Sequence, residues 1–155
     1  MPTFKGQYEH SVDSKGRVSF PAKLRKSLTP EAQERFTVLR GVDPCLQLYP
    51  ADEWQVLEQR LSKINSFSEK GRTVKRHLLR YAEDVSLDNQ NRIALPSQLM
   101  EYAGIKDKAI FIGSVEYVEV WSPEKLAAED SQISDEMYQE LFEHVMGNGD
   151  INDNT

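Results

Sequence analysis

A short motif with charged side chains at fixed spacing occurs twice in the chain. Asp13 and Arg17 stand four positions apart, and Asp88 and Arg92 repeat this pair 75 positions later. The planar guanidinium of arginine can bind a phosphate, or the O6 and N7 atoms of a guanine through two parallel hydrogen bonds. Alternatively, each arginine pairs with its aspartate on the surface, which is worth only about 0–1 kcal/mol. The motif alone leaves both interpretations open, a phosphate or guanine contact and a solvated ion pair.

Further cations accompany the first copy of the motif but not the second. The first copy contributes Lys15, Arg17, Lys23, Arg25 and Lys26. At the corresponding places the second copy has Gln90, Arg92, Gln98, Met100 and Glu101. We therefore predict that the first copy supplies the main DNA-binding face, and that Arg92 and, with weaker support, Lys5 add contacts. The residues expected to shape the two turns rather than to bind are Asp13, Gly16, Asp88 and Asn91.

The net charge of −6 does not exclude such a face, because the charge is unevenly distributed. Residues 1–82 carry a net charge of +6, whereas residues 83–155 carry −12. Residues 127–155 contain eight acidic side chains and no lysine or arginine. Salt screens charges more than about 8 Å apart at physiological ionic strength, so a basic face can act locally.

The sequence contains none of the short patterns that mark phosphate-binding loops, zinc proteases, serine hydrolases or dinucleotide-binding folds. The three histidines, His10, His77 and His144, are far apart in sequence and suggest no metal site. Asp13 and Asp88 are better explained as turn residues than as a catalytic carboxylate pair. We predict no catalytic residue, no metal and no cofactor.

Cysteine content and hydropathy indicate the cellular compartment in which the protein is expected. The single cysteine, Cys45, excludes an intrachain disulfide and favours a reducing compartment. No apolar run approaches the ~20 residues of a membrane span. The start, Met1–Gly6, lacks the apolar region of a signal peptide. We expect a cytoplasmic protein with no membrane and no small-molecule substrate as partner.

The charged motif lies within a longer repeat that predicts its scaffold. Asp13–Leu24 and Asp88–Leu99 share one pattern of aspartate, arginine, alternating apolar residues, proline and leucine, and the match resumes at Gly41 and Gly113. Alternation of polar and apolar residues predicts strands on both sides of the motif. Glycine or asparagine at the place before the arginine permits the positive φ of a tight turn. Each copy is therefore predicted as a β-hairpin, a short helix and a second β-hairpin.

Neither copy alone, at roughly 45 residues, buries enough surface to be stable. We therefore predict a mainly β fold with helices (α+β), a small β-barrel of two intertwined hairpin–helix repeats at residues 3–50 and 83–126. Helical spacing of apolar residues predicts a helical linker packed on the barrel at residues 51–82, interrupted at Ser66–Ser68. Residues 127–155 are expected to form an acidic helix, beginning near Ser134, and a disordered tail from residue 147.

The repeated motif resembles that of the AbrB-like (SpoVT-AbrB) swapped-hairpin fold. Two copies in one chain, with Gly41–Pro50 after the first and Phe4–His10 at the start, are similar to the MraZ family over about residues 3–126. The resemblance implies a sequence-specific DNA-binding transcriptional regulator, a repressor of its own division and cell-wall gene cluster located at the nucleoid. It also implies a homo-oligomeric ring that binds short direct repeats in double-stranded promoter DNA. Asn91 departs from the glycine usual at that place, and Gln90 stands where the first copy has Lys15.

An antitoxin of the same hairpin fold is the alternative. Such antitoxins bind operator DNA and cover a toxin with an acidic, disordered C-terminal segment. The acidic residues 127–155 favour that interpretation. The duplication argues against it, because such antitoxins typically carry one copy of the hairpin unit and dimerise.

Overall fold

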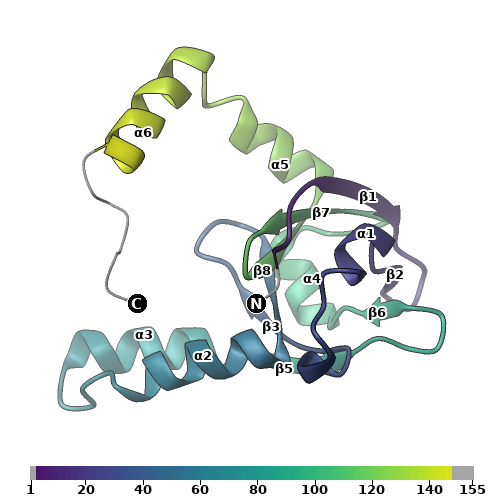
Figure 1. Ribbon diagram of the computed structural model, residues 1–155, viewed down its shortest axis with the longest axis horizontal. Coiled ribbons are helices and arrows are strands. Elements are labelled where there is room, and N and C mark those ends of the chain that lie inside the picture. Colours follow the sequence, from purple (N-terminus) through teal and green to yellow (C-terminus); the bar gives the residue numbers. More distant parts are fainter. Residues whose placement is uncertain (1–2, 148–155) are drawn as a thin grey trace. The chain divides into compact units, whose positions relative to one another are not determined.

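The computed structural model describes residues 3–147 (Figure 1), which form two compact units that divide after Pro123. The first unit contains β1 (Gln7–Ser11), β2 (Arg17–Ser19), α1 (Ala22–Arg25), a 3-10 turn (Pro30–Ala32), β3 (Arg35–Arg40), β4 (Leu46–Pro50), α2 (Ala51–Ser62), α3 (Glu69–Leu79), β5 (Glu83–Ser86), β6 (Arg92–Ala94), α4 (Ser97–Ala103), β7 (Lys108–Ser114) and β8 (Tyr117–Trp121). α5 (Pro123–Asp130) and α6 (Asp135–Gly147) follow in the second unit.

The two repeats interlock strand by strand. The larger sheet has six strands in the order β1-β7-β8-β4-β3-β5, and its ladders are all antiparallel. Its outer pairs join opposite repeats, since β1 pairs with β7 and β5 pairs with β3. β4 and β8 join the repeats at the centre, and β2 and β6 form a separate two-stranded ribbon. This confirms the α+β class and the intertwined repeats predicted from the sequence.

The expected barrel is not closed by hydrogen bonds within residues 3–147. β1 and β5 are the edges of the larger sheet, and each leads through a tight turn into the ribbon. β2 and β6 are only three residues long, and an isolated bridge between Val12 and Val18 is what links β1 to β2. The strands are therefore better described as a six-stranded sheet with a ribbon packed against it than as one continuous barrel.

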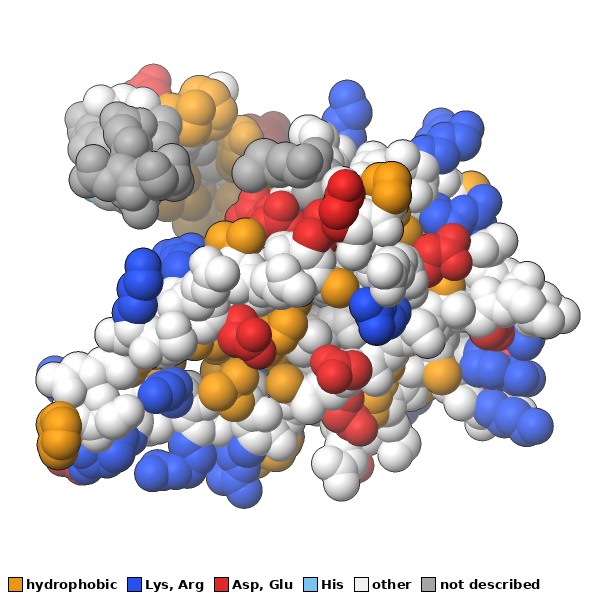
Figure 2. Space-filling view, turned by 60° about the horizontal axis from the view of Figure 1, so that its bottom comes forward, with side chains coloured by type: hydrophobic (Ala, Val, Ile, Leu, Met, Phe, Trp, Pro, Cys, Tyr) orange, Lys and Arg blue, Asp and Glu red, His pale blue; other side chains and the backbone are white. Residues whose placement is uncertain are grey.

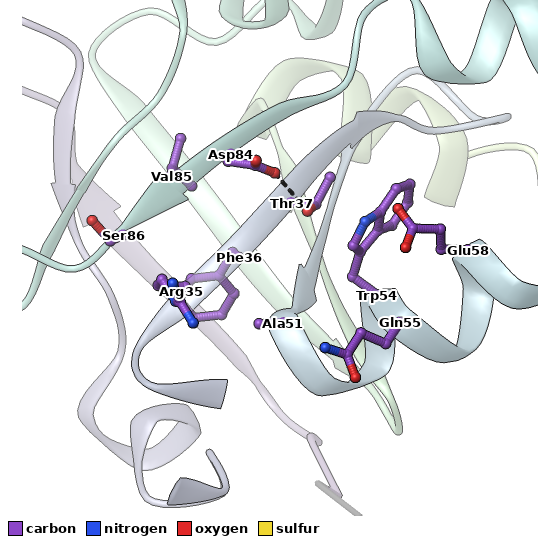
Figure 3. Close-up of a pocket in the computed structure, with 10 residues that line it drawn as sticks. All are labelled: Arg35, Phe36, Thr37, Ala51, Trp54, Gln55, Glu58, Asp84, Val85 and Ser86. Atoms are coloured by element: carbon purple, nitrogen blue, oxygen red, sulfur yellow. Dashed lines mark hydrogen bonds between the residues drawn. The ribbon is translucent and has the colours of Figure 1, made fainter. Parts of the chain in front are cut away.

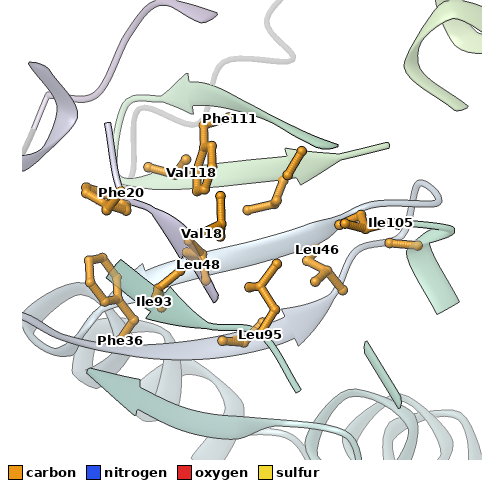
Figure 4. Packing of buried hydrophobic residues seen from close by; sticks show 14 of the residues in the cluster. Val18, Phe20, Phe36, Leu46, Leu48, Ile93, Leu95, Ile105, Phe111 and Val118 are labelled. Atoms are coloured by element: carbon orange, nitrogen blue, oxygen red, sulfur yellow. The ribbon is translucent and has the colours of Figure 1, made fainter. Parts of the chain in front are cut away.

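The core lies between the ribbon and the larger sheet (Figure 4). Val18 and Ile93 point inward from the ribbon and are at most 1% exposed. Just after β2, the ring of Phe20 lies 5.1 Å from that of Phe36 and 5.9 Å from that of Phe111, measured between centroids. Full burial of one such side chain contributes about 1.5–3 kcal/mol. The residues that alternate with Val18 and Ile93 must then face solvent, which fixes the outer face of the ribbon.

The helices agree with the predicted spacing in all but one place. α2 and α3 are separated at residues 63–68, as predicted, and the Ser68 hydroxyl caps α3 by accepting from the Gly71 amide at 3.1 Å. α2 contacts β3 and β4. α6 begins at Asp135, as predicted, and Ser134 accepts a capping bond from the Met137 amide at 3.1 Å.

α5 was not predicted, although Pro123 suits the first turn of a helix. The disordered tail predicted from residue 147 falls, beyond that residue, outside the described residues. None of the helices within residues 3–147 is both long and apolar enough to cross a membrane.

Candidate nucleic-acid interface

The first turn holds its arginine in place through one carboxylate. Oδ1 of Asp13 accepts hydrogen bonds from the backbone amides of Lys15 and Arg17, each at 2.9 Å. Oδ2 of Asp13 accepts from Nε of Arg17 at 2.8 Å. The backbone closes the same turn, since the Gly16 amide donates to the carbonyl of Asp13 at 3.0 Å. Asp13 thereby fixes both the turn and the direction of the guanidinium.

The second turn repeats this geometry. Oδ1 of Asp88 accepts from the amides of Gln90 and Arg92 at 2.8 and 2.9 Å, and Oδ2 accepts from Nε of Arg92 at 3.0 Å. In both turns the described contacts of the arginine use Nε, which leaves the outer Nη edge of the guanidinium for a ligand. The surface ion pair and the DNA contact weighed for the sequence are thus compatible, because they use different edges of the guanidinium.

Backbone conformation explains the residue before each arginine. Gly16 has a φ of +78° and Asn91 a φ of +59°, both in the left-handed region that glycine and asparagine tolerate best. A Cβ atom at Gly16 would lie only 3.0 Å from the carbonyl oxygen of Leu95. The turns also tie the ribbon together, since Leu95 donates to the Gly16 carbonyl at 2.9 Å and Phe20 to the Asn91 carbonyl at 3.0 Å.

The ribbon places the two arginines on one face. Arg17 is paired with Ala94, and Ser19 is paired with Arg92. All four residues alternate with the buried Val18 and Ile93 and therefore point outward. Arg17 and Arg92 are diagonal neighbours, which places them about 7–8 Å apart. The outer ribbon face consequently presents two aspartate-held guanidiniums from the two repeats.

Most of the basic residues that were predicted to bind DNA lie next to this face in the structure. Lys15 is exposed in the first turn, Lys23 is exposed and Arg25 is half-buried on α1, and Lys26 is exposed at the C-terminal end of that helix. α1 follows β2 after two residues. Figure 2 shows lysine and arginine side chains gathered at the right of the molecule, at the end that holds β2, α1 and β6 in Figure 1.

Lys5 is not brought together with these residues. It precedes β1, whereas the first turn follows β1, so Lys5 lies at the opposite end of that strand. Lys106 is placed at the first turn instead: it lines a hollow with Lys15 and Gly16, and the adjacent Asp107 carbonyl accepts from the Val12 amide at 2.9 Å. The pairing of β1 with β7 creates this proximity, and the local motif carries no signal for it.

The hydrogen bonds lower the pKa of both turn carboxylates. The backbone amide of Arg17 has the largest effect on the pKa of Asp13, and the Arg17 side chain and the Lys15 amide lower it further. The amide of Arg92 has the largest effect on the pKa of Asp88. A carboxylate with a lowered pKa stabilises the folded turn above the unfolded value of about 3.9, and this contribution is lost as pH falls through the lower folded value.

We therefore expect the Arg17 Nε–H to stay hydrogen-bonded from neutral pH down through the unfolded value of about 3.9, and to be released only as pH falls through the lowered pKa of Asp13. NMR of the Asp13 carboxyl carbon and the Arg17 Nε–H measures both events. A carboxyl midpoint at or above about 3.9 would contradict the turn geometry, because that is the value without these bonds.

A second hollow, of about 400 Å³, lies beside β5 (Figure 3). Its lining includes residues of the strands β3 and β5 together with Trp54 and Glu58 of α2. The hydroxyl of Thr37 donates to Asp84 at 2.9 Å across it, which ties β3 to the edge strand β5. Within residues 3–147, histidine, cysteine and acidic side chains nowhere form a group that could hold a metal ion.

Comparisons of the sequence with known proteins agree on one family. The model of the family described as "MraZ protein, putative antitoxin-like" matches residues 3–77 and again residues 78–144. A relative from Caldanaerobacter subterraneus, named "Transcriptional regulator MraZ", is 41% identical over 140 residues, or 90% of this chain and 94% of its own. Relatives of the same name from Natranaerobius thermophilus and Syntrophomonas wolfei are 42% and 39% identical, over 79% and 94% of this chain and 82% and 99% of theirs.

Proposed function

The chain belongs to the MraZ family, and from this premise we infer that it is a transcriptional regulator that binds double-stranded promoter DNA in a sequence-specific manner. The observation that carries the proposal is the outer face of the β2–β6 ribbon. It presents Arg17 and Arg92 side by side, each held at Nε by its own aspartate. The names of the relatives support regulation of transcription, and the ribbon supplies a chemistry by which it can occur.

The ribbon suits the major groove of DNA, which admits a two-stranded β-ribbon. A guanidinium fixed at Nε offers its outer edge in a defined direction, and so it meets the O6 and N7 atoms of guanine with little loss of side-chain entropy. One good bidentate pair of this kind is worth about 1–3 kcal/mol of discrimination against another base. Arg17 and Arg92 are therefore assigned to base recognition.

The cations around the first turn are assigned to the DNA backbone. Lys15, Lys23, Arg25 and Lys26 are on the first repeat only, and Lys106 reaches the same turn from the second. Phosphate contacts fix the register of a protein on DNA and supply most of its salt-dependent affinity. The first repeat therefore provides the main DNA face, and the second repeat adds Arg92.

Specific action by so small a face requires several copies. We place the protein in a homo-oligomeric ring that binds short direct repeats, represses its own division and cell-wall gene cluster, and resides at the nucleoid in the cytoplasm. Basic faces bind DNA non-specifically with a Kd of roughly 10⁻⁴–10⁻⁶ M, and joining several faces raises the affinity by about 10²–10⁴ through effective concentration. The function requires no cofactor and no small-molecule substrate.

The test is a fluorescence-anisotropy titration of the native protein with DNA from upstream of its own gene and with a scrambled duplex, at ~150 mM salt. We expect tighter binding to the upstream DNA, with an affinity that falls as salt rises because counterions are released. Equal, weak binding to both duplexes would contradict sequence-specific regulation and leave only an electrostatic surface.

An antitoxin-like role is the second candidate, and the acidic helix α6 with its exposed apolar side chains is the observation in its favour. In that role α6 would bind a toxin. A neighbouring gene for a small toxin would favour this function, whereas division and cell-wall genes as neighbours would favour the regulator.

A further inference from the structure

The helix α6 exposes a continuous apolar face. Met137 and Leu141 lie four positions apart, Tyr138 and Phe142 repeat that spacing, and Val145 continues it. Such spacing places all five on one side of the helix. Each of these side chains is between 39% and 59% exposed. A helix of 13 residues is marginal in water without packing, so this face calls for a partner surface.

The rest of α6 is acidic. Asp135, Glu136, Glu140 and Glu143 belong to the helix, which contains no lysine or arginine. Glu136 and Glu140 lie four positions apart, which places them together on one side of the apolar face. Any surface that covers α6 is therefore expected to combine apolar side chains with positive charge.

A surface of that kind exists in the first unit. We call residues 60–80 the cationic arm; it comprises the end of α2, the connecting segment and α3. The arm contains seven basic residues and a single acidic one, Glu69. Figure 2 shows lysine and arginine side chains gathered along it, at the left of the molecule. The ion pairs Arg17–Asp13, Arg92–Asp88 and Lys108–Glu9 do not involve the arm. Within the arm, Arg72 donates to the Ser66 carbonyl at 3.0 Å and Lys75 donates to the Ser66 hydroxyl at 3.3 Å, and neither bond neutralises the positive charge.

The cationic arm also exposes apolar side chains. Phe67 is 95% exposed, Val74 55% and Leu79 40%. Leu79 lies three positions from Arg76 and four from Lys75, so the three side chains share one face of α3. The arm thus combines exposed apolar side chains with positive charge, as expected of a surface that covers α6.

We propose that α6 of one copy of this chain docks on the cationic arm of a second copy. Contact between two α6 helices would bring acidic side chains together, and contact between two arms would bring cations together, so only the unlike surfaces attract each other. The helices are also of similar length, about 20 Å for α6 and about 17 Å for α3. A contact between unlike surfaces is heterologous, and repetition of it closes a ring if the rotation allows.

This contact rests on the proposed function in one respect, because it supplies the interface of the proposed ring. It gives the acidic helix a role within the assembly of identical subunits. A toxin or another protein bound to α6 becomes an outcome against the proposal.

The first test compares two single substitutions by sedimentation velocity at micromolar concentration. Leu141→Asp places a charge within the apolar face of α6, whereas Gln139→Asp places the same charge two positions away, on a different face. We expect Leu141→Asp to raise the concentration needed for half-assembly at least about tenfold, which corresponds to 1.4 kcal/mol or more. Gln139→Asp is expected to leave assembly nearly unchanged.

The second test reverses charge on each surface and remains informative if an α6 substitution unfolds that helix. One variant carries Glu136→Lys and Glu140→Lys, and the other carries Lys75→Glu and Arg76→Glu. Each variant alone is expected to assemble less well than the native chain. An equimolar mixture of the two is expected to recover assembly, because every contact between unlike variants again joins opposite charges.

The outcomes separate this contact from the proposed function. A native ring unaffected by Leu141→Asp and by both charge reversals would overturn the contact and leave the regulator standing. Recovery only when both reversals share one chain, and not on mixing, would overturn it in favour of docking on the same chain. A native protein that sediments as one subunit would overturn both the contact and the ring. A native ring that fails to bind DNA would contradict the regulator alone.

Discussion

Replacing Arg17 with alanine is expected to weaken binding to the upstream DNA roughly 10- to 100-fold at ~150 mM salt, which corresponds to about 1–3 kcal/mol. The guanidinium is held at Nε by Asp13, at 2.8 Å, and the Arg17 side chain is 36% exposed. Alanine removes the bidentate donor and leaves the turn itself, because Asp13 still accepts from two backbone amides. Anisotropy titration of the variant against the native chain measures the loss.

Two matched variants identify the cause of the lost DNA affinity. Arg17→Lys keeps the charge but not the planar fork, and we expect it to recover the salt-dependent part of binding and not the preference for upstream over scrambled DNA. Arg92→Ala is expected to cost less than Arg17→Ala, because fewer cations surround the second turn. An equal loss for Arg92→Ala would show that both repeats contribute alike, and the assignment of the main face to the first repeat would be wrong.

Substituting Gly113 with alanine is expected to lower the free energy of unfolding by about 3 kcal/mol or more. A Cβ atom at this position would overlap the backbone of Phe4 and Lys5, which cannot move aside as a side chain tip can. The segment is anchored there, since Phe4 exchanges two backbone hydrogen bonds with Val115, at 2.8 and 2.9 Å, and the Phe4 side chain is 1% exposed. Displacing this segment forfeits the burial of a phenylalanine, which typically costs about 3–5 kcal/mol.

Chemical denaturation of Gly113→Ala and of Gly147→Ala checks this expectation. No heavy atom lies within 4 Å of a Cβ built at Gly147, which lies at the end of α6. The control substitution is therefore expected to change stability by less than about 0.5 kcal/mol. A Gly113→Ala variant as stable as the native chain would mean that the Phe4 segment does not lie against β7.

Local structure around the motif was predictable from the sequence because its causes are local. Asp13 accepts bonds from residues two and four positions on, and Gly16 provides the positive φ that the turn requires. The same argument predicted a positive φ for Asn91 at the matching place in the second turn, and its φ is +59°. The start of α6 near Ser134 was predicted from the helical spacing of the apolar residues beyond it, and in the structure the Ser134 hydroxyl accepts from the Met137 amide. The duplication also indicated that the repeats interlock, because one copy buries too little surface alone.

Arrangements that depend on pairing between distant strands could not be predicted from the sequence. The diagonal placement of Arg17 and Arg92 depends on the register of β2 against β6, and a shift of one residue would turn one arginine inward. The position of Lys106 depends on β1 pairing with β7. The ribbon strands β2 and β6 are only three residues long, a length that the repeat pattern does not define.

The central claim, that the first turn lies on DNA, is tested most directly by crosslinking from matched positions in the two turns. Ser14 and Asn89 are equivalent and exposed, and the native Cys45 is fully buried, so Ser14→Cys and Asn89→Cys each introduce one accessible thiol. Upstream DNA with a thiol-reactive tether on a base is offered to each variant. The account predicts a crosslink mainly from Ser14→Cys, on upstream and not on scrambled DNA. No crosslink from Ser14→Cys, or an equal yield on upstream and scrambled DNA, would contradict it.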